Sequence, residues 1–276
     1  MRLLAVTGLV ALAVGARAGE GGAAAAVRRT DDRGGAWRAL EPGLDLGVFA
    51  GPSGDVAVVR IDPGRFELRL LNASAPGEGM LRTARGWAAR AGAVAAINAA
   101  MYQEDYRTSV SLMRTRAHVN HPRVSKDKAV LAFDPLVRGA PPVKLIDREC
   151  ENLDAVRAAY GTLVQSIRLV SCDRRNVWEP SPRKVSMAAI GVDGKGRVLF
   201  IHARAPSPVH ELVNALLAMP IDLRQAMYVE GGPEAQLYVK GGGRELEWVG
   251  GFERAPGAEN ASAWPVPNVI VVVPKR

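Results

Sequence analysis

Short apolar segments, separated by residues that favour turns, recur along most of this 276-residue chain. Runs of roughly four to eight residues rich in Val, Ile and Leu are typical of β-strands rather than of longer helices. A sheet must therefore supply most of the core. We expect strands at residues 55–61, 66–71, 94–97, 130–133, 163–170, 188–192, 198–202, 226–229 and 269–273.

Helical signals interrupt these strands at three places. Residues 81–90 are rich in Ala and are followed by Gly92, Asn152 can cap a helix at 153–160, and Pro208 can open a helix that runs to about residue 219. Strands and helices together predict an α+β fold, a single domain with a mixed β-sheet core and a few packed helices. The glycine run at 241–243 lacks the strand-to-helix setting of a phosphate-binding loop and is expected to form a hairpin loop.

The N-terminus has the pattern of a secretory signal peptide. Arg2 precedes an apolar run at 3–14, and small residues at 16 and 18 offer a cleavage site. We expect a signal peptide at 1–18, a flexible leader at 19–36 and a folded domain at 37–276, secreted or periplasmic; an uncleaved short anchor is the alternative. No run reaches the ~18 apolar residues of a membrane-spanning helix, so no stable membrane span is expected.

The charge pattern, the cysteines and the histidines limit which partners, crosslinks and metal sites are expected. The 36 basic residues are interspersed with 28 acidic ones, and no basic stripe or aromatic motif accompanies them, so no nucleic acid is expected as a partner. In an oxidising compartment Cys150 and Cys172 favour a disulfide, with two buried free thiols as the alternative. The four histidines lack the spacing of a helical zinc site; no metal ligand is assigned and no cofactor is expected, although the pattern leaves a divalent metal open.

Polar side chains stand in or after three of the predicted strands, where rigid scaffolds often place binding and catalytic groups. Asn98 follows the strand at 94–97, and its amide can donate and accept hydrogen bonds or simply complete a turn. Arg168 lies inside an apolar run, which requires a phosphate or a structural ion pair to balance it. Glu230 and Glu234 flank a glycine turn, where they could divide acid and base chemistry or lie as solvated acids on a hairpin.

Taken in order, these segments resemble the phosphodiester glycosidase domain family. Asn-Ala-Ala-Met-Tyr at 98–102 is similar to the family's Asn-Ala-Gly-Met-Tyr, and Gln165-Ser166 is similar to its Gln-Ser-Gly strand. Residues 189–193 resemble its glycine-containing strand, and Tyr-Val-Glu-Gly-Gly at 228–232 stands where the family has Leu-Asp-Gly-Gly-Gly-Ser. The resemblance covers residues 37–273.

The resemblance implies an exported hydrolase that cleaves a sugar-1-phosphodiester between the anomeric carbon and the phosphate oxygen. Its partner would be a phosphodiester-linked glycan or envelope polymer. The catalytic residues it implies are Glu230, Glu234 and Asp105. The substrate-binding residues are Asn98, Tyr102, Arg114, Gln165, Arg168, His202, Gly231 and Gly232.

Several positions depart from the family pattern. Glu230 stands for its Asp, Pro233 for its third Gly and Glu234 for its Ser, while Met187 stands where the family has an Arg. Because a shift of one methylene in a catalytic carboxylate can cost about 10²-fold in rate, these changes bear on activity more than on fold. The alternative to the hydrolase is therefore a non-catalytic glycan or envelope-polymer binding protein that retains the fold.

Overall fold

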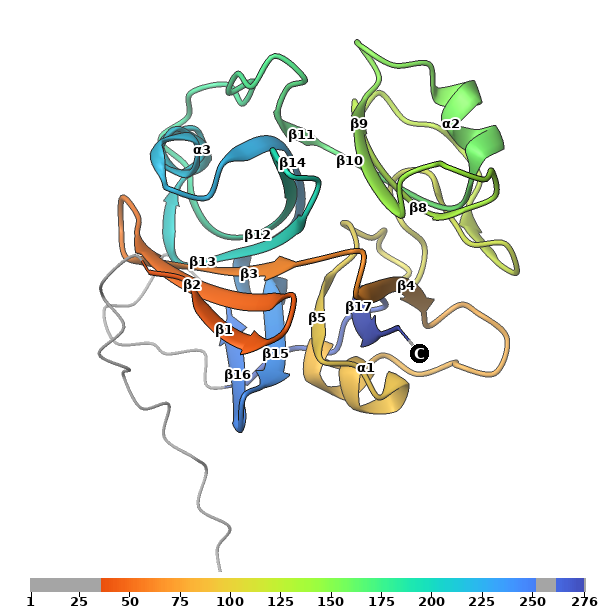
Figure 1. Ribbon diagram of the computed structural model, residues 1–276, viewed down its shortest axis with the longest axis horizontal. Coiled ribbons are helices and arrows are strands. Elements are labelled where there is room, and N and C mark those ends of the chain that lie inside the picture. Colours follow the sequence, from red (N-terminus) through yellow and green to blue (C-terminus); the bar gives the residue numbers. More distant parts are fainter. Residues whose placement is uncertain (1–35, 252–261, 276) are drawn as a thin grey trace, which may run out of the picture. The chain divides into compact units, whose positions relative to one another are not determined.

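The computed structural model describes residues 36–251 and 262–275 (Figure 1). The predicted signal peptide at 1–18 and the leader, except for residue 36, lie outside these residues, so both stay predictions. Strands dominate the described chain and three α-helices accompany them, which confirms the α+β prediction. Among the described residues, no helix is long and apolar enough to cross a membrane.

The strands form three sheets in which every paired neighbour is antiparallel, so hairpins and short loops suffice to connect many of them. The seven-stranded sheet has the order β1 (Arg38–Glu41), β2 (Leu44–Ala50), β3 (Asp55–Ile61), β13 (Val198–Pro208), β12 (Lys184–Asp193), β14 (Leu223–Gly231) and β11 (Arg168–Val170). One five-stranded sheet has the order β7 (Val119–His121), β6 (Met113–Arg114), β10 (Tyr160–Ser166), β8 (Ala129–Pro135) and β9 (Val143–Asp147). The other has the order β16 (Arg244–Val249), β15 (Gln236–Gly241), β5 (Ala95–Asn98), β17 (Asn268–Pro274) and β4 (Phe66–Asn72).

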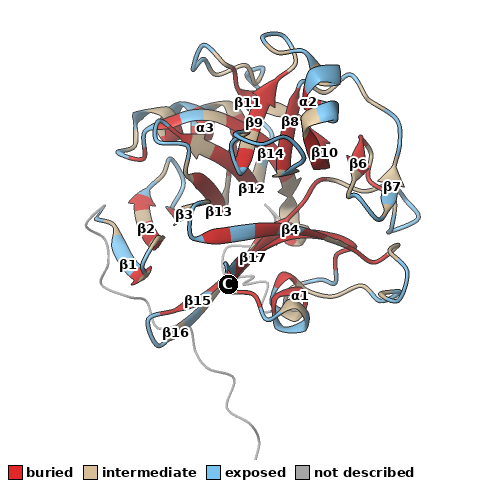
Figure 2. Ribbon diagram, turned by 45° about the vertical axis from the view of Figure 1, so that its right-hand side comes forward, coloured by how far each residue is buried: buried red, intermediate tan, exposed pale blue. Residues whose placement is uncertain are grey.

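All three sheets contribute to one apolar core. Val59 and Phe200 enter it from the seven-stranded sheet, Leu131 from the sheet of β8, and Ile97 and Ile270 from the sheet of β5, and all five are fully buried. Figure 2 shows the buried strands that enclose this core. Since one cluster joins the sheets, residues at the ends of strands in different sheets can meet in one site.

Each helix covers the outer side of one sheet with its own smaller cluster of apolar residues. Helix α1 (Ala84–Ala91) begins after Thr83 and ends at Gly92, whose φ of 63° completes the predicted stop. Helix α2 (Leu153–Ala159) has the predicted cap, because the side chain of Asn152 accepts hydrogen bonds from the first turn. Helix α3 (Val209–Ala218) begins one residue later than expected, since Pro208 still belongs to β13 and is the capping residue.

The predicted strand at 163–170 is two strands in two different sheets. Strand β10 ends at Ser166 and β11 begins at Arg168. Between them the chain is bonded to β14, because the Ser166 hydroxyl donates to the Tyr228 carbonyl at 2.5 Å and the Tyr228 N–H donates to the Ile167 carbonyl at 2.9 Å. The chain thus passes from one sheet to the next beside the strand that carries Glu230.

The glycine run at 241–243 forms the predicted hairpin loop between β15 and β16. Gly241 pairs with Arg244, and the two residues between them, Gly242 and Gly243, have φ values of 58° and 72°. Two consecutive positive φ values are the requirement of the tight hairpin turn, and glycine meets it without a steric penalty.

Candidate functional site

Two carboxyl groups and two phenols gather where β14 ends. Strand β14 delivers Tyr228 and Glu230, and the 3₁₀ helix η1 (Gly232–Glu234) that follows delivers Glu234. Tyr102 comes from the segment after β5. Burial raises the pKa of both Tyr102 and Tyr228, and the negative charges of Glu230 and Glu234 act in the same direction. We call Tyr102, Tyr228, Glu230 and Glu234 the carboxylate cluster.

Within the carboxylate cluster, Glu230 has a carboxyl group whose pKa is shifted to near neutral pH. Burial raises its pKa from 4.5 to about 7, and the neighbouring charge of Glu234 acts in the same direction. One hydrogen bond opposes the shift, because the Gly231 N–H donates to Glu230 Oε1 at 2.9 Å. A carboxyl group with such a pKa can both accept and release a proton near pH 7, as general acid–base catalysis requires.

Each of the two tyrosines in the carboxylate cluster packs against a further aromatic ring. The ring centroid of Tyr228 lies 5.4 Å from that of Trp178, and the centroid of Tyr102 lies 5.7 Å from that of Tyr106. Only 15 of the 276 residues are Phe, Trp or Tyr, and Tyr102 was the one of these among the site residues predicted from the sequence. The fold gathers four of those few rings at one place, which composition alone could not indicate.

A cation that sequence reasoning missed also faces the cluster. The positive charge of Arg183 lowers the pKa of Tyr228, against the larger effects that raise it. The segment before it is fastened to α3, because Asn176 Nδ2 donates to the His210 carbonyl at 2.9 Å and His210 Nδ1 lies 2.5 Å from the Trp178 carbonyl. The available signal was a basic residue placed just before a buried strand.

Asn98 and His202 hold the turn that carries Glu234. Asn98 is buried; its Nδ2 donates to the Glu234 carbonyl at 3.0 Å and its Oδ1 accepts from Gln236 N at 2.7 Å. Burial lowers the pKa of His202 to about 4, so its uncharged ring donates from Nε2 to the Ala235 carbonyl at 3.1 Å. The structure therefore brings both predicted binding residues to the cluster, where they bond to its backbone.

The predicted glycines allow a close approach at the same turn. A Cβ at Gly231 would collide with the Tyr228 hydroxyl, and Gly232 has a φ of 64°, a conformation that side chains rarely adopt. On the other side of the turn, a Cβ at Gly250 would collide with the Gly232 carbonyl. The space beside the carboxyl groups thus depends on three glycines, two of them among the residues predicted from sequence.

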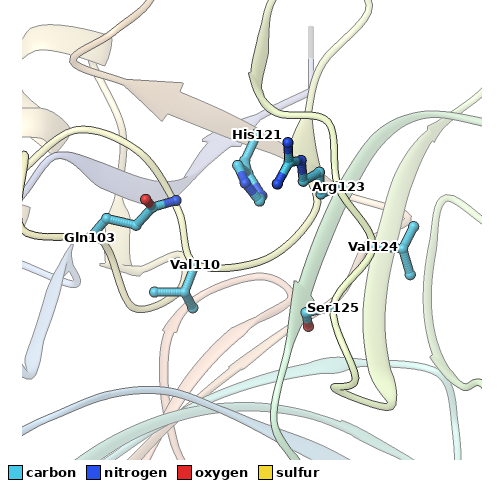
Figure 3. Close-up of a pocket in the computed structure, with 6 residues that line it drawn as sticks. All are labelled: Gln103, Val110, His121, Arg123, Val124 and Ser125. Carbon is cyan, nitrogen blue, oxygen red and sulfur yellow. The ribbon is translucent and has the colours of Figure 1, made fainter.

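A hollow of about 460 Å³ adjoins the segment that carries Tyr102 (Figure 3). Two of its lining residues lie close to Tyr102 along the chain or in space. Gln103 directly follows Tyr102, and the N–H of Val110 donates to the carbonyl of Met101, which directly precedes Tyr102, at 3.1 Å. None of its lining residues was among the site residues predicted from the sequence. They are Gln103, Val110, His121, Arg123, Val124 and Ser125.

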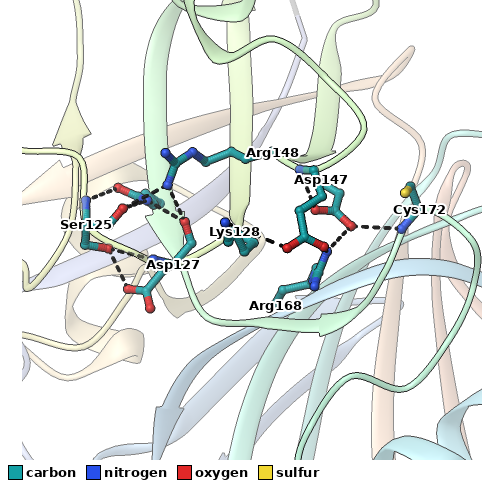
Figure 4. Close-up of polar contacts among 9 residues, drawn as sticks. Ser125, Asp127, Lys128, Asp147, Arg148, Arg168 and Cys172 are labelled. Carbon is teal, nitrogen blue, oxygen red and sulfur yellow. Dashed lines mark hydrogen bonds and ion pairs between the residues drawn. The ribbon is translucent and has the colours of Figure 1, made fainter.

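Figure 4 shows a network of hydrogen bonds and ion pairs that connects Ser125 and Asp127, through Arg148 and Lys128, to Arg168. Gln165 is bonded to Ser125 and Asp127 in this network. Gln165 Oε1 accepts from Ser125 N at 3.0 Å, and its Nε2 donates to the carbonyls of Ser125 and Asp127 at 3.1 and 2.7 Å. The same two carbonyls accept from Arg148 Nη1. We call this set, from Ser125 through Gln165 to Arg168, the Gln165–Arg168 network; it engages both ends of the Gln165 amide.

Arg168 is balanced by carboxylates. Its Nη1 lies 2.5 Å from Asp147 Oδ2 and 2.7 Å from Glu149 Oε2, and these bonds raise the pKa of the guanidinium against the effect of burial (Figure 4). Asp147 is almost completely buried, and the bond from Arg168 holds the pKa of its carboxyl below the ordinary value. Of the two possibilities left open by the sequence, the structure shows the ion pair.

Two further predicted residues are bonded within their own surroundings. Arg114 Nη2 donates to the carbonyls of Arg157 and Tyr160 at 2.9 and 3.2 Å. Asp105 lies in an exposed turn, where hydrogen bonds, chiefly from Thr108, lower the pKa of its carboxyl. Neither is among the groups that shift the pKa of Glu230.

The predicted disulfide between Cys150 and Cys172 is present, with 6.6 Å between the two Cα atoms. It adjoins the Gln165–Arg168 network, because Cys172 N donates to Asp147 Oδ2 at 3.2 Å. Across residues 36–251 and 262–275, the one group of three closely spaced potential metal ligands is Asp147, Cys150 and Cys172. The disulfide already occupies both of its sulfur atoms.

The model of the phosphodiester glycosidase family matches residues 91–273, which is more than half of the chain. The chain belongs to the phosphodiester glycosidase family. The match spans the carboxylate cluster and the Gln165–Arg168 network, and begins later than the residue 37 expected from the sequence. No curated protein matches the sequence.

Solved structures share the fold of this phosphodiester glycosidase domain. The catalytic domain of zebrafish N-acetylglucosamine-1-phosphodiester alpha-N-acetylglucosaminidase, auto-inhibited by its pro-peptide, matches with a TM-score of 0.60 and 9% identity over 85% of each chain. A hypothetical protein from Synechocystis matches with a TM-score of 0.58 and 14% identity, covering 83% of this chain and 61% of the other. At such identities the likeness concerns the fold.

Proposed function

We propose that this phosphodiester glycosidase family member is an exported hydrolase that cleaves a sugar-1-phosphodiester, with Glu230 as the group that moves the proton. The observation that carries the proposal is a carboxyl group whose pKa of about 7 is set by burial and by a second carboxylate, at the end of a strand that the family model matches. The disulfide supports export, because such bonds persist in oxidising compartments.

The chemistry of the bond explains why one proton-transfer group suffices. The leaving group is a phosphate monoester, a weakly basic anion, so its departure needs little protonation, whereas water needs a base to become an effective nucleophile. In the proposed reaction the water oxygen bonds to the anomeric carbon and the electron pair of the broken carbon–oxygen bond goes to the phosphate oxygen. The water proton goes to the ionised Glu230, and the products are a free sugar and a phosphate monoester.

The neighbours of Glu230 suit the other charges of this reaction. The anomeric centre gains positive charge in the transition state, which the negative charge of Glu234 stabilises. The phosphate needs a cation, and since Arg114 and Arg168 are bonded elsewhere in the protein, we assign this role to Arg183, whose charge acts on Tyr228. Asn98 and His202 position the Glu234 turn.

The decisive experiment compares Glu230→Gln with the wild type in an assay of sugar release from a sugar-1-phosphodiester. We expect kcat to fall by about 10²–10⁴-fold, the usual contribution of general acid–base catalysis. Glu211→Gln, which removes an exposed carboxylate on α3, is the matched control and should retain the wild-type rate. Undiminished sugar release by Glu230→Gln would contradict the assignment.

One observation favours the second candidate, a binding protein without turnover. Met187 is fully buried in the apolar cluster under α3, at the position where the family carries an Arg. Titration calorimetry against envelope glycans, run beside the turnover assay, separates the two functions. Binding with no sugar release by the wild type would support the binder, and any release abolished by Glu230→Gln would exclude it.

A further inference from the structure

The hollow beside the carboxylate cluster has two nitrogen-bearing side chains that the rest of the protein does not use. Figure 3 shows His121 and Arg123 side by side, with Gln103 and Val110 across the hollow from them. Within the described residues, the exposed guanidinium of Arg123 has no hydrogen-bond or ion-pair partner. A free guanidinium presents a planar fork of donors that matches the oxygens of an anion.

The imidazole of His121 adds a donor at the same place. Its Nδ1 is buried and has no hydrogen-bond partner in the described part of the chain. A buried N–H without an acceptor is costlier than a buried lone pair without a donor, so the favoured neutral tautomer carries its proton on Nε2. The ring then offers Nε2–H as a donor.

The walls of the hollow are held before any ligand arrives. Gln103 is fixed by a bond from its Nε2 to the Ser109 carbonyl at 2.9 Å. Ser125 is fixed by the Gln165–Arg168 network, and its hydroxyl donates to Asp127 Oδ2 at 2.8 Å. Because these groups are already ordered, binding does not have to order them, which favours affinity.

The local charge selects an anion. From residue 114 to residue 128 the chain carries five Lys and Arg residues and a single acid, Asp127. That acid does not line the hollow; its carboxylate accepts hydrogen bonds from the hydroxyls of Ser111 and of Ser125, which does line it. An anion in the hollow would meet the fork of Arg123 and the Nε2–H of His121.

We propose that this hollow is a second anion site that binds a phosphoryl group through the Arg123 guanidinium and the His121 Nε2–H. It is separate from the phosphate position assigned at Arg183 and does not depend on the proposed hydrolysis. The phosphoryl group comes either from free phosphate or from a further phosphate of the substrate, beyond the bond that is cleaved.

The test is a calorimetric titration of the full chain with inorganic phosphate at pH 7 and low salt. We expect Arg123→Gln to weaken binding at least 10-fold and His121→Gln about 5-fold, as expected for one charge-assisted and one neutral hydrogen bond. Arg138→Gln, which removes another exposed arginine without a partner among the described residues, should bind phosphate as the wild type does. Circular dichroism melting of each variant verifies that it is folded.

Two further measurements complete the test. No phosphate binding by the wild type, equal binding by Arg123→Gln, or acetate binding as tight as phosphate would each overturn the proposal. Repeating the titration in Glu230→Gln separates this site from the proposed reaction, because phosphate should still bind there. If the site serves the substrate, Arg123→Gln raises KM for a glycan with two phosphodiesters more than for one with a single phosphodiester; if it serves free phosphate, only inhibition by phosphate changes.

Discussion

The carboxylate cluster and the Gln165–Arg168 network are two polar regions of the molecule that differ in how fully their polar groups are paired. In the Gln165–Arg168 network, both ends of the Gln165 amide are bonded and Asp147 is paired with Arg168 (Figure 4). In the carboxylate cluster, Glu230 receives a single backbone hydrogen bond and faces a second carboxylate, and its pKa rises to about 7. Paired groups hold a fold together, whereas a buried carboxyl group left without a cation is available for proton transfer.

The largest expected effect on stability comes from breaking the paired region with Arg168→Met. This change leaves the buried carboxylate of Asp147 without its guanidinium, which should cost about 4 kcal/mol of unfolding free energy. Urea denaturation at pH 7 measures the loss, and Arg175→Met, at an exposed pair with Asp173, should cost well under about 1 kcal/mol. The rate of sugar release per folded molecule should not change; a fall like that of Glu230→Gln would place Arg168 in the reaction.

The next largest effect is on how stability depends on pH, which should differ between the wild type and a variant without the Glu230 carboxyl group. Because the pKa of Glu230 is raised from 4.5 to about 7 on folding, the folded state keeps a proton that the unfolded chain releases. The stability this gives is present below pH 4.5 and is lost as the pH rises to about 7. At about 1.4 kcal/mol per pKa unit, Glu230→Gln should gain on the order of 3 kcal/mol relative to the wild type across that range. Urea denaturation of both proteins at several pH values checks this, and a difference that does not vary with pH would contradict the raised pKa.

A smaller effect is expected at Asn98, because both ends of its side-chain amide are bonded to the turn that carries Glu234. Asn98→Ala leaves the Glu234 carbonyl and the Gln236 N–H without their partners, at a cost of about 2 kcal/mol in unfolding free energy. Since the turn carries Glu234, kcat should fall as well, with little change in KM. Asn214→Ala, at an exposed amide on α3, is the control. A rise in KM alone would instead show that Asn98 contacts the substrate directly.

Sequence reasoning succeeded where a residue's neighbours in the chain decide its structure. The cap at Asn152, the stop at Gly92 and the hairpin at 241–243 depend on local backbone conformation, and all were predicted. Glu230 could be singled out because it directly follows an apolar strand. That it meets Tyr102 could not be derived from spacing, since 128 positions separate them; for this the family resemblance was needed.

Partners distant in sequence account for what was missed. An arginine inside an apolar run shows that an anion must lie nearby, but not whether it is a ligand or a carboxylate such as Asp147, 21 positions earlier. The chain passes from one sheet to another at Ile167, but no glycine or proline marks this point. Since the apolar pattern continues through it, the sequence reads as a single strand. Arg183 lies outside every predicted strand, and only tertiary packing brings it to Tyr228.

The passage of the chain at Ile167 has a consequence for motion. Tyr228, two residues before Glu230, is fastened by its N–H to the Ile167 carbonyl and by its own carbonyl to the Ser166 hydroxyl, at the seam between two sheets. A local opening on either side of this seam must break a hydrogen bond to β14, the strand that carries Glu230. The sheet of β10 therefore restrains the end of β14 that carries Glu230, and a local opening of that sheet releases this restraint.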